Sequence, residues 1–401
     1  MKNGWEQKKI ADIAEVKSGK RVPKGYKFED QKTPYPYIRV SNFEDDGTIN
    51  ASDLKYISKE VYDGISRYII TQDDLYVSIA GTIGKTGFVP KWLDGANLTE
   101  NACRLVFTNG IDKRFVHYFT KSSEFVRQAG HQTRVAAQPK LALSRLKEIV
   151  VPIPQSLPEQ RRIVGILDEA FDGIAKAKAY AEKNLQNARA LFESHLNAVF
   201  ERSSKEVPLS ELATDITDGD HSPPPKAPSG IPFITISNIV KRTRSIDFGD
   251  TFYVPEDYFI NLKPNKKPRV GDVLYTVTGA TLGIPVLIRE QRDFCFQRHI
   301  GLIRPKPDVD SAWLNYALLA PQLFRQATVG STGTAQKTVS LGVLRGLKVP
   351  KIGPTEQKRV AARLDSLEAQ TQHLESIYQR KLAALDELKK SLLHQAFSGE
   401  L

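Results

Sequence analysis

The sequence predicts an α+β fold, in which two mixed, mostly β domains are joined by two long helices that form an antiparallel coiled coil. Two motifs recur in the same order and predict a pseudo-two-fold internal repeat: PYIRVSNF from Pro36 returns as PFITISNI from Pro232, and LPEQRRIVGILD from Leu157 returns as PTEQKRVAARLD from Pro354. The period greatly exceeds the roughly 50 residues of solenoid and propeller units, so each copy has the size of a domain plus an extra element.

The first part of each copy is rich in β-forming residues. Residues 1–154 contain YIRVS, DLYVSIAG and CRLVF, and residues 204–352 contain VLYTVTG, VLIRE and IGLIRP. Short runs of this kind, broken by Gly, Pro, Asn and Asp, are typical of a mixed, mostly β domain with long loops. A proline-bounded run closes each part, because proline ends a strand and fits the first turn of a helix. We therefore expect one domain at 1–154 and a second at 204–352.

The rest of each copy, residues 155–203 and 353–401, has the period of a long helix. Apolar residues of the second helix alternate three and four positions apart, which is the heptad pattern of a coiled coil. They are Val360, Leu364, Leu367, Leu374, Tyr378, Leu385, Leu388 and Leu392, with Thr371 and Lys381 interrupting the stripe. The first helix carries smaller residues at this period, namely Ile163, Leu167, Ala170, Ile174, Ala177, Ala181, Ala188 and Leu191. We expect the two helices to pair antiparallel; the alternative is that each packs on its own domain.

Charge and cysteine content limit the class of partner. The net charge of +11 and the pI near 9.3 favour a polyanion, with duplex DNA and RNA ahead of membranes. A pseudo-two-fold molecule also suits a two-fold partner such as duplex DNA. Cys103 and Cys295 have no metal-ligand spacing, which indicates a reducing compartment and no structural zinc. The chain has neither a signal-peptide pattern nor a run of 18 apolar residues, so we expect a soluble, cytoplasmic protein.

Motifs for catalysis are incomplete. GTIGKT at 81–86 resembles a phosphate-binding loop, but Ile79 stands where that loop requires glycine, and the second copy, GATLGI, has no lysine. SPPP at 222–225 resembles the amino-methyltransferase motif, but Pro225 replaces the aromatic residue that would stack on the target base. We expect tight turns and a rigid loop at these places. The chain is therefore predicted to be a recognition protein with no catalytic residues, metal site or cofactor of its own.

Several strings recur in a fixed order along both copies. They are the loops KSGKRVPKG and TDGDHSPP, the strand-turns YIRVSNF and FITISNI, the hairpins VSIAGTIGKTGFV and TVTGATLGIPVLI, the strings NLTENACRL and TAQKTVSLGVLRGLKVP, the EQ(R/K)R helix starts and the terminal LLHQAFSGEL. With this combination the chain resembles, over its full length, the specificity subunit of type I restriction-modification enzymes.

The resemblance implies a division of labour. Each β-rich domain would be a target recognition domain that reads one half of a bipartite DNA site, and the helices at 155–203 and 353–401 would be conserved spacers that dock two modification subunits. Those subunits would carry S-adenosylmethionine and methylate adenine N6, while restriction subunits would use ATP and Mg to translocate and cleave unmodified DNA. This chain would then be the non-catalytic specificity subunit, without a cofactor.

Candidate DNA contacts are polar residues in the predicted loops, because Lys, Arg and Ser suit phosphates whereas Arg, Asn and Gln suit base edges. In the first copy they are Lys20, Arg21, Lys24, Arg39, Ser41, Asn42, Arg134, Gln138 and Lys140. In the second copy they are His221, Ser237, Asn238, Lys241, Arg242, Arg244, Gln297, Arg298, Gln336 and Lys337. His299 is a further loop histidine that either contacts DNA or is an ordinary surface residue.

Three alternatives stay open from the residues alone. The repeated Ser41–Asn42 and Ser237–Asn238 pairs fit either a shared turn or a shared DNA contact. The chain could serve a modification-only system without restriction subunits. A different class of function is a coiled-coil scaffold with two protein- or glycan-binding domains, which would bind without a steep dependence on salt.

Overall fold

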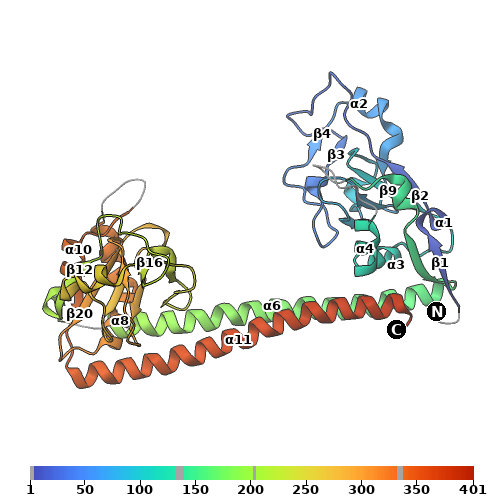
Figure 1. Ribbon diagram of the computed structural model, residues 1–401. Coiled ribbons are helices and arrows are strands. Elements are labelled where there is room, and N and C mark those ends of the chain that lie inside the picture. The colour runs from blue at the N-terminus through green and yellow to red at the C-terminus, as the bar shows by residue number, and fades with distance from the viewer. Residues whose placement is uncertain (1–3, 132–139, 202–204, 332–336) are drawn as a thin grey trace. The chain divides into compact units, whose positions relative to one another are not determined.

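The computed structural model describes residues 4–131, 140–201, 205–331 and 337–401. The chain divides into two compact units (Figure 1): unit 1 is Met1–Ala181 with Arg380–Leu401, and unit 2 is Glu182–Gln379. This division differs from the four consecutive segments expected from the sequence, because each unit combines one β-rich domain with a stretch of both long helices.

The domain of unit 1 contains two four-stranded sheets and one two-stranded sheet. In spatial order they are β2 (Ala14–Ser18), β9 (Ala102–Phe107), β6 (Leu75–Ser78) and β7 (Thr86–Gly87); β4 (Lys55–Tyr56), β3 (Pro36–Ile38), β8 (Ala96–Leu98) and β5 (Ile69–Ile70); and β1 (Trp5–Lys9) with β10 (Val150–Pro154). Its helices are α1 (Ile10–Ile13), η1 (Val40–Asn42), α2 (Lys59–Gly64), η2 (Ser66–Tyr68), η3 (Lys91–Leu93), α3 (Lys113–Thr120), α4 (Ser123–His131) and α5 (Leu143–Lys147).

Unit 2 repeats this arrangement with shorter outer sheets. Its sheets are β12 (Ala213–Asp218), β20 (Ile300–Pro305), β17 (Val273–Thr276) and β18 (Pro285–Leu287); β16 (Phe252–Val254), β13 (Ile231–Ile234) and β19 (Cys295–Phe296); β14 (Ile239–Val240) with β15 (Ser245–Ile246); and β11 (Glu206–Pro208) with β21 (Lys348–Pro350). Its helices are η4 (Leu209–Glu211), η5 (Ile236–Asn238), α7 (Glu256–Ile260), η6 (Pro264–Lys266), η7 (Gly279–Thr281), α8 (Ser311–Leu319), α9 (Pro321–Val329) and α10 (Leu341–Gly346). The shared topology confirms the internal repeat.

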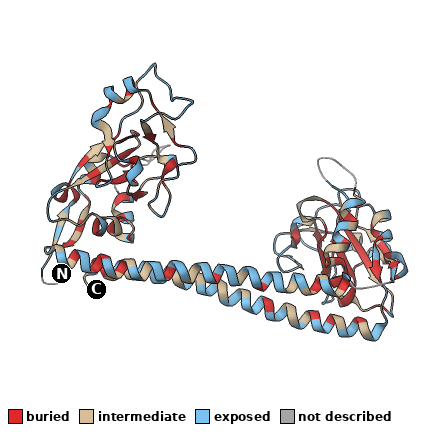
Figure 2. Ribbon diagram, turned by 180° about the vertical axis from the view of Figure 1, so that it is seen from behind, coloured by how far each residue is buried: buried red, intermediate tan, exposed pale blue. Residues whose placement is uncertain are grey.

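One sheet of each domain, which we call the central sheet, has apolar cores on both faces. It is the sheet of β2, β9, β6 and β7 in unit 1 and the sheet of β12, β20, β17 and β18 in unit 2. All four residues of β6 are buried, and successive side chains of a strand point to opposite faces. Leu75 and Val77 therefore enter the core beneath α3, whereas Tyr76 enters the core shared with β3 and β8. The strand β17 repeats this division. Figure 2 shows the buried interior of each domain. A continuous apolar run is the expected sequence of a strand covered on both sides.

Two helices of equal length, α6 (Leu157–Glu201) and α11 (Pro354–Ser398), account for the heptad stretches. In unit 1 the Lys389 ammonium lies 5.0 Å from the ring of Phe171, and Lys178 pairs with Asp386. Residue numbers along α11 therefore fall as those along α6 rise, which means that the two helices are antiparallel. In unit 2 the Arg189 Nε lies 3.2 Å from a Glu375 oxygen, and the end of α6 shares a core with the start of α11. The antiparallel pairing predicted from the heptads is confirmed within each unit (Figure 1).

The contact between the helices is narrower than the heptad pattern predicted. Ala181 and Ala188 are buried in it, and so is Thr371, which interrupts the apolar stripe. Leu191 and Leu388, however, are 42% and 47% exposed, and Leu374 is also exposed. Their prediction as seam residues was wrong, because α6 brings mainly alanine side chains to the contact and these cannot cover larger residues at the edge of the stripe.

Each domain core is completed by the end of the helix that belongs to the other copy. In unit 1 the Phe397 ring of α11 packs edge-on against Phe115 and Phe119 of α3, at centroid distances of 5.2 and 5.4 Å. In unit 2 the Phe200 ring of α6 packs against Trp313 of α8 at 6.3 Å. The string LLHQAFSGEL is therefore a core segment of unit 1, and the corresponding segment of α6 serves unit 2.

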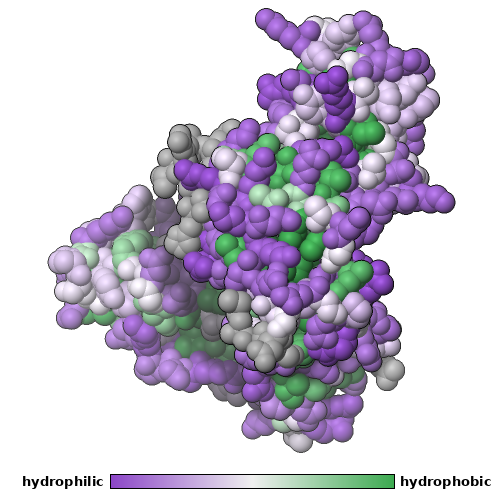
Figure 3. Space-filling model, turned by 90° about the vertical axis from the view of Figure 1, so that its right-hand side faces the viewer, coloured by the Kyte–Doolittle hydropathy of each residue, from purple (hydrophilic) through white to green (hydrophobic). Residues whose placement is uncertain are grey.

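The surface agrees with the basic, hydrophilic composition. Figure 3 shows a face dominated by hydrophilic side chains and interrupted by small hydrophobic patches. No helix among the described residues combines the length and apolar character that crossing a membrane requires.

Candidate nucleic-acid interface

Loops from distant parts of the sequence meet at one end of the central sheet in unit 1. The backbone N–H of Lys20 donates to the carbonyl of Leu98 at 2.8 Å, and that of Thr99 donates to the carbonyl of Ile38 at 3.0 Å. We call this group loop cluster 1; it comprises residues 19–21, 39–41, 79–80, 98–101 and 140.

The corresponding loops of unit 2 meet in the same way. The N–H of Asp220 donates to Phe296 at 2.9 Å, and the carbonyl of Asp220 accepts from Arg298 at 3.0 Å. The N–H of Gln297 donates to Ile234 at 3.0 Å. We call this group loop cluster 2; it comprises residues 219–221, 235–237, 277–278, 297–299 and 337–338.

One isolated β-bridge per unit attaches a late segment of the domain to its cluster. Ala80 pairs with Lys140 in unit 1, and Thr278 pairs with Thr338 in unit 2. The Thr278 and Thr338 hydroxyls are also 3.1 Å apart. The second bridge repeats the first at the equivalent position, so the two clusters have one architecture.

A glycine in each cluster permits the close approach of two loops. A Cβ atom on Gly19 would lie 2.0 Å from the carbonyl oxygen of Thr99, and one on Gly219 would lie 1.9 Å from that of Phe296. Only glycine fits at such distances. The first loop of each cluster therefore lies directly against the segment that precedes β9 in unit 1 and β20 in unit 2.

Four of the predicted residues lie exposed in loop cluster 1. The Lys20 ammonium is 5.7 Å from the Tyr68 ring, and the Arg21 Nε donates to Glu100 at 2.6 Å. The others are Ser41 and Lys140. Lys24 is also exposed, a few residues beyond the cluster on the same loop. These cationic and hydroxyl groups are of the kinds that contact phosphates and base edges.

Loop cluster 2 brings together five predicted residues. The His221 Nε2 lies 2.8 Å from an Asp218 oxygen, and the Ser237 hydroxyl lies 2.6 Å from that of Thr235. The others are Gln297, which is half-buried, and the exposed Arg298 and Lys337. Burial and the Arg298 charge lower the pKa of His299 beside them, so this histidine is neutral near pH 7 and one ring nitrogen can accept a hydrogen bond.

Three predicted arginines are occupied by contacts within their own unit. The Arg39 guanidinium is bonded to the carbonyl (2.9 Å) and carboxylate (2.6 Å) of Asp53. On the hairpin of β14 and β15, Arg242 donates to Gln379 of α11 at 3.0 Å, and Arg244 pairs with Glu368 of α11. Lys241 is exposed on the same hairpin. Arg242 and Arg244 thus attach the hairpin to α11 and do not belong to loop cluster 2.

Asn42 and Asn238 are turn residues. Both side chains are buried. The Asn42 Oδ1 accepts from the N–H of Arg39, and the Asn238 Oδ1 accepts from that of Thr235, each at 2.9 Å. Their amide groups donate to backbone carbonyls further along the loop. Of the two alternatives for the repeated Ser–Asn pairs, the geometry supports the turn for asparagine, so we omit Asn42 and Asn238 from the proposed DNA contacts. Arg134, Gln138 and Gln336 lie outside the described residues.

The repeated EQ motif has a role that sequence reasoning missed. The Gln160 Oε1 accepts from the N–H of Asp112, which caps α3, at 2.8 Å, and its Nε2 donates to Pro154 at 2.9 Å. Gln357 makes the same bonds to Asp310 and Ile352, at 2.8 and 2.9 Å. This glutamine fixes the long helix to its domain. Its recurrence in both copies was the signal that could have revealed it.

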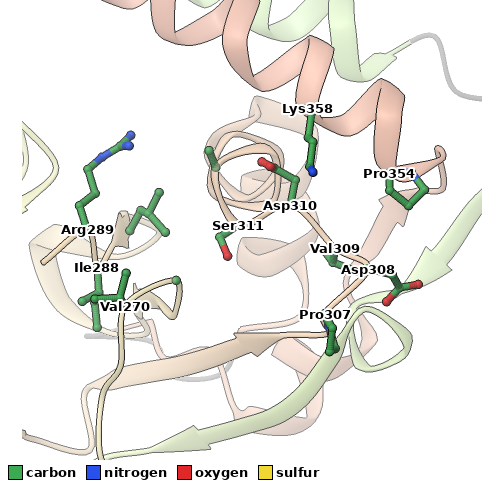
Figure 4. Close-up of a pocket in the computed structure, with 13 residues that line it drawn as sticks. Val270, Ile288, Arg289, Pro307, Asp308, Val309, Asp310, Ser311, Pro354 and Lys358 are labelled. Carbon is green, nitrogen blue, oxygen red and sulfur yellow. The ribbon is translucent and has the colours of Figure 1, made fainter. Parts of the chain in front are cut away.

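One cavity in each unit lies at the opposite end of the central sheet from the loop cluster. In unit 2 a cavity of about 520 Å³ opens between the start of α11, the start of α8 and the turn before β17. Figure 4 shows Lys358 and Asp310 projecting into it. Unit 1 has an equivalent cavity of about 390 Å³ beside Arg161 and Asp112. Within the described residues, no group of three or more His, Cys, Asp or Glu is placed to hold a metal ion.

Comparison with known proteins agrees with the resemblance found in the sequence. Residues 2–182 match the type I restriction modification DNA specificity domain. The chain is 24% identical to the type I restriction enzyme MjaVIII specificity subunit of Methanocaldococcus jannaschii, covering 99% of this chain and 93% of that protein. It is 22% identical to the EcoBI specificity subunit of Escherichia coli, covering 100% and 86% of the two chains.

Solved structures share the fold over the whole chain. A chain from a structure described as the basis of complex assembly and conformational transition of the type I R-M system aligns with a TM-score of 0.79 at 19% identity, covering 100% of this chain and 99% of that one. The HsdS subunit of Thermoanaerobacter tengcongensis aligns with a TM-score of 0.65 at 20% identity, covering 100% and 98%. The resemblance found in the sequence is thus confirmed by full-length relatives that are specificity subunits of type I restriction enzymes, and the solved structures show that the shared fold extends over the whole chain.

Proposed function

We propose that this chain is the DNA-sequence specificity subunit of a type I restriction-modification complex. Loop cluster 1 reads one half of a bipartite duplex site and loop cluster 2 reads the other. The observation that carries this proposal is that two loop clusters of one architecture present different polar side chains. A shared scaffold with different reading groups is what recognition of two unlike half-sites requires.

The proposed recognition domains are residues 1–154 and 204–352, and the proposed spacers are 155–203 and 353–401. In this proposal the chain is non-catalytic and holds no cofactor, and it works in the cytoplasm. It docks two modification subunits, which supply S-adenosylmethionine and methylate adenine N6. Restriction subunits that use ATP and Mg join the same complex and cleave unmodified DNA.

Domain exchange tests this proposal. Residues 1–154 are replaced by the corresponding domain of a relative with a different site, and the assembled complex is mapped by methylation-sensitive sequencing. We expect one half of the methylated motif to change and the other to stay, because loop cluster 2 is untouched. A change in both halves, or the absence of any bipartite motif in the wild type, would refute independent reading by two clusters.

A further inference from the structure

Arg21 and Glu100 form an ion pair at the tip of loop cluster 1. The Arg21 Nε donates to the Glu100 Oε1 at 2.6 Å, while 78% of the arginine side chain and 27% of the glutamate side chain are exposed. The Thr99 hydroxyl donates to the other Glu100 oxygen at 3.0 Å. The carboxylate is thus held from two sides, and the guanidinium is fixed through its inner nitrogen.

The bond at Nε leaves the outer edge of the guanidinium directed away from its partner. That edge carries the two terminal amino groups, which present a pair of parallel N–H donors. Guanine offers a matching pair of acceptors, O6 and N7, in the major groove. Lysine cannot reproduce this geometry, because its ammonium is a point charge without a planar fork.

The backbone beneath Arg21 is rigid. Lys20 is bonded through its N–H to Leu98 and through its carbonyl to the Tyr37 hydroxyl, at 2.8 and 2.6 Å. Gly19 lies against Thr99, where a Cβ atom would not fit. A base reader gains affinity when its geometry is set before binding, since less conformational entropy is lost.

The charge state of Glu100 agrees with this arrangement. Partial burial acts to raise its pKa, but hydrogen bonds from Arg21, the backbone and Thr99 outweigh that effect and lower it. The carboxylate is therefore ionised near pH 7 and holds Arg21 by a charge-assisted bond.

We propose that Arg21 reads a guanine in the half-site of loop cluster 1 and that Glu100 is the residue that positions it. This inference rests on the proposed function, because it names one base contact of the same interface. In loop cluster 2 the equivalent turn carries Arg298 where loop cluster 1 has Glu100. The two units therefore present an arginine from opposite loops of one scaffold.

The test uses the full chain assembled with its modification subunits. Methylation is measured on a DNA library in which one half-site is fixed to the wild-type sequence of loop cluster 2 and the other half-site is randomised. We expect Arg21→Lys to lower the discrimination for guanine at one position by about 10- to 100-fold, with the other positions unchanged. Glu100→Ala should have the same positional effect, and Glu100→Gln a smaller one because its amide oxygen still accepts from Nε.

The matched control is a second exposed Arg–Glu pair of unit 1, in which the Arg127 Nε donates to Glu124 at 2.9 Å on α4. Arg127→Lys and Glu124→Ala should leave the motif unchanged. Loss of methylation on all sequences alike in Arg21→Lys marks a phosphate contact and overturns the inference, as does unchanged discrimination. If the wild-type complex shows no bipartite preference, the proposed function itself fails, so the two failures are distinguishable.

Discussion

The two units differ at their loop ends far more than in their frameworks. The framework repeats down to single contacts: the Asp74 carboxylate accepts from the N–H of Thr71 in unit 1 as the Asp272 carboxylate accepts from that of Arg269 in unit 2, at 2.8 and 2.9 Å. The hairpin of β14 and β15 and the corresponding turn of unit 1, closed by the Phe43–Ile49 bridge, are by contrast attached differently. In unit 1 the Asp45 carboxylate binds Lys85 of the same domain at 2.8 Å, whereas in unit 2 the hairpin reaches α11 through arginines. The polar contacts of the framework therefore recur in both units, whereas those that attach the hairpins do not.

The largest expected effect concerns the helix ends that complete each core. Phe397→Ala should destabilise unit 1 by about 3–5 kcal/mol, because it empties a buried aromatic site between Phe115 and Phe119. Phe200→Ala should do the same for unit 2. Amide hydrogen exchange measures this, with protection lost in α3 for the first variant and in α8 for the second. Leu388→Ala, at a position that is 47% exposed, is the control and should change little. Equal loss in both units from one substitution would contradict separate cores.

A smaller effect is expected at the repeated glutamine. Gln160→Leu leaves the N–H of Asp112 and the carbonyl of Pro154 without their partner and should cost about 1–3 kcal/mol. Gln357→Leu should cost a similar amount in unit 2, as its bonds have the same lengths. Urea denaturation measures both. As a control, Glu159→Gln weakens an exposed pair and should cost only about 0.5 kcal/mol. A large difference between the two glutamine variants would show that the frameworks are not equivalent.

The smallest effect is a dependence of the stability of unit 1 on pH, through His117. Burial, reinforced by the charges of Lys121, Arg114 and Lys389, lowers the pKa of His117 to about 3. Below pH 6.5 the unfolded histidine binds a proton that the folded unit excludes, so stability falls as the pH drops from 6.5 toward 3. Between pH 7.5 and 5.5 we expect a loss of about 1 kcal/mol by urea denaturation.

The equivalent position of unit 2 suggests the substitution that tests this dependence. Its equivalent of His117 is Asn315, which is buried and cannot titrate in this range. His117→Asn should therefore remove the loss from unit 1, and Phe115→Leu, a change of volume nearby, should leave the slope in place. A slope that persists in His117→Asn would assign the acid sensitivity to another group.

The fold could be predicted well because its main signals, the internal repeat and the heptads, extend over many residues and can be recognised in a single sequence. The repeat and the heptads established two domains and an antiparallel helix pair, and the strands followed from apolar runs such as that of β6. The residues exposed at the edge of the helix contact were missed, because a heptad count does not say how wide the contact is. Because small alanine side chains of α6 face leucine side chains of α11, part of the apolar stripe stays exposed to solvent.

The candidate site was less predictable, because exposure and partners depend on tertiary contacts. Arg244 appears in the sequence as a loop cation beside Lys241, yet the fold buries most of its side chain against Glu368. Glu100 was not considered as part of the interface, because an acidic residue is a poor candidate for contact with a polyanion. Only the fold places it beside Arg21, where its role is to hold the arginine.

The position of Phe397 after all of unit 2 in the sequence sets the order in which the two units are completed during synthesis. Unit 2 has all of its residues once Gln379 has been made, whereas unit 1, begun first, waits for the last turns of α11. At about 5–20 residues per second, roughly ten to forty seconds pass between the synthesis of Ala181 and that of Phe397. During this interval Phe115 and Phe119 lack their cover. The nascent first domain therefore exposes apolar surface to chaperones, and to misassembly with a second nascent copy, until α11 is made.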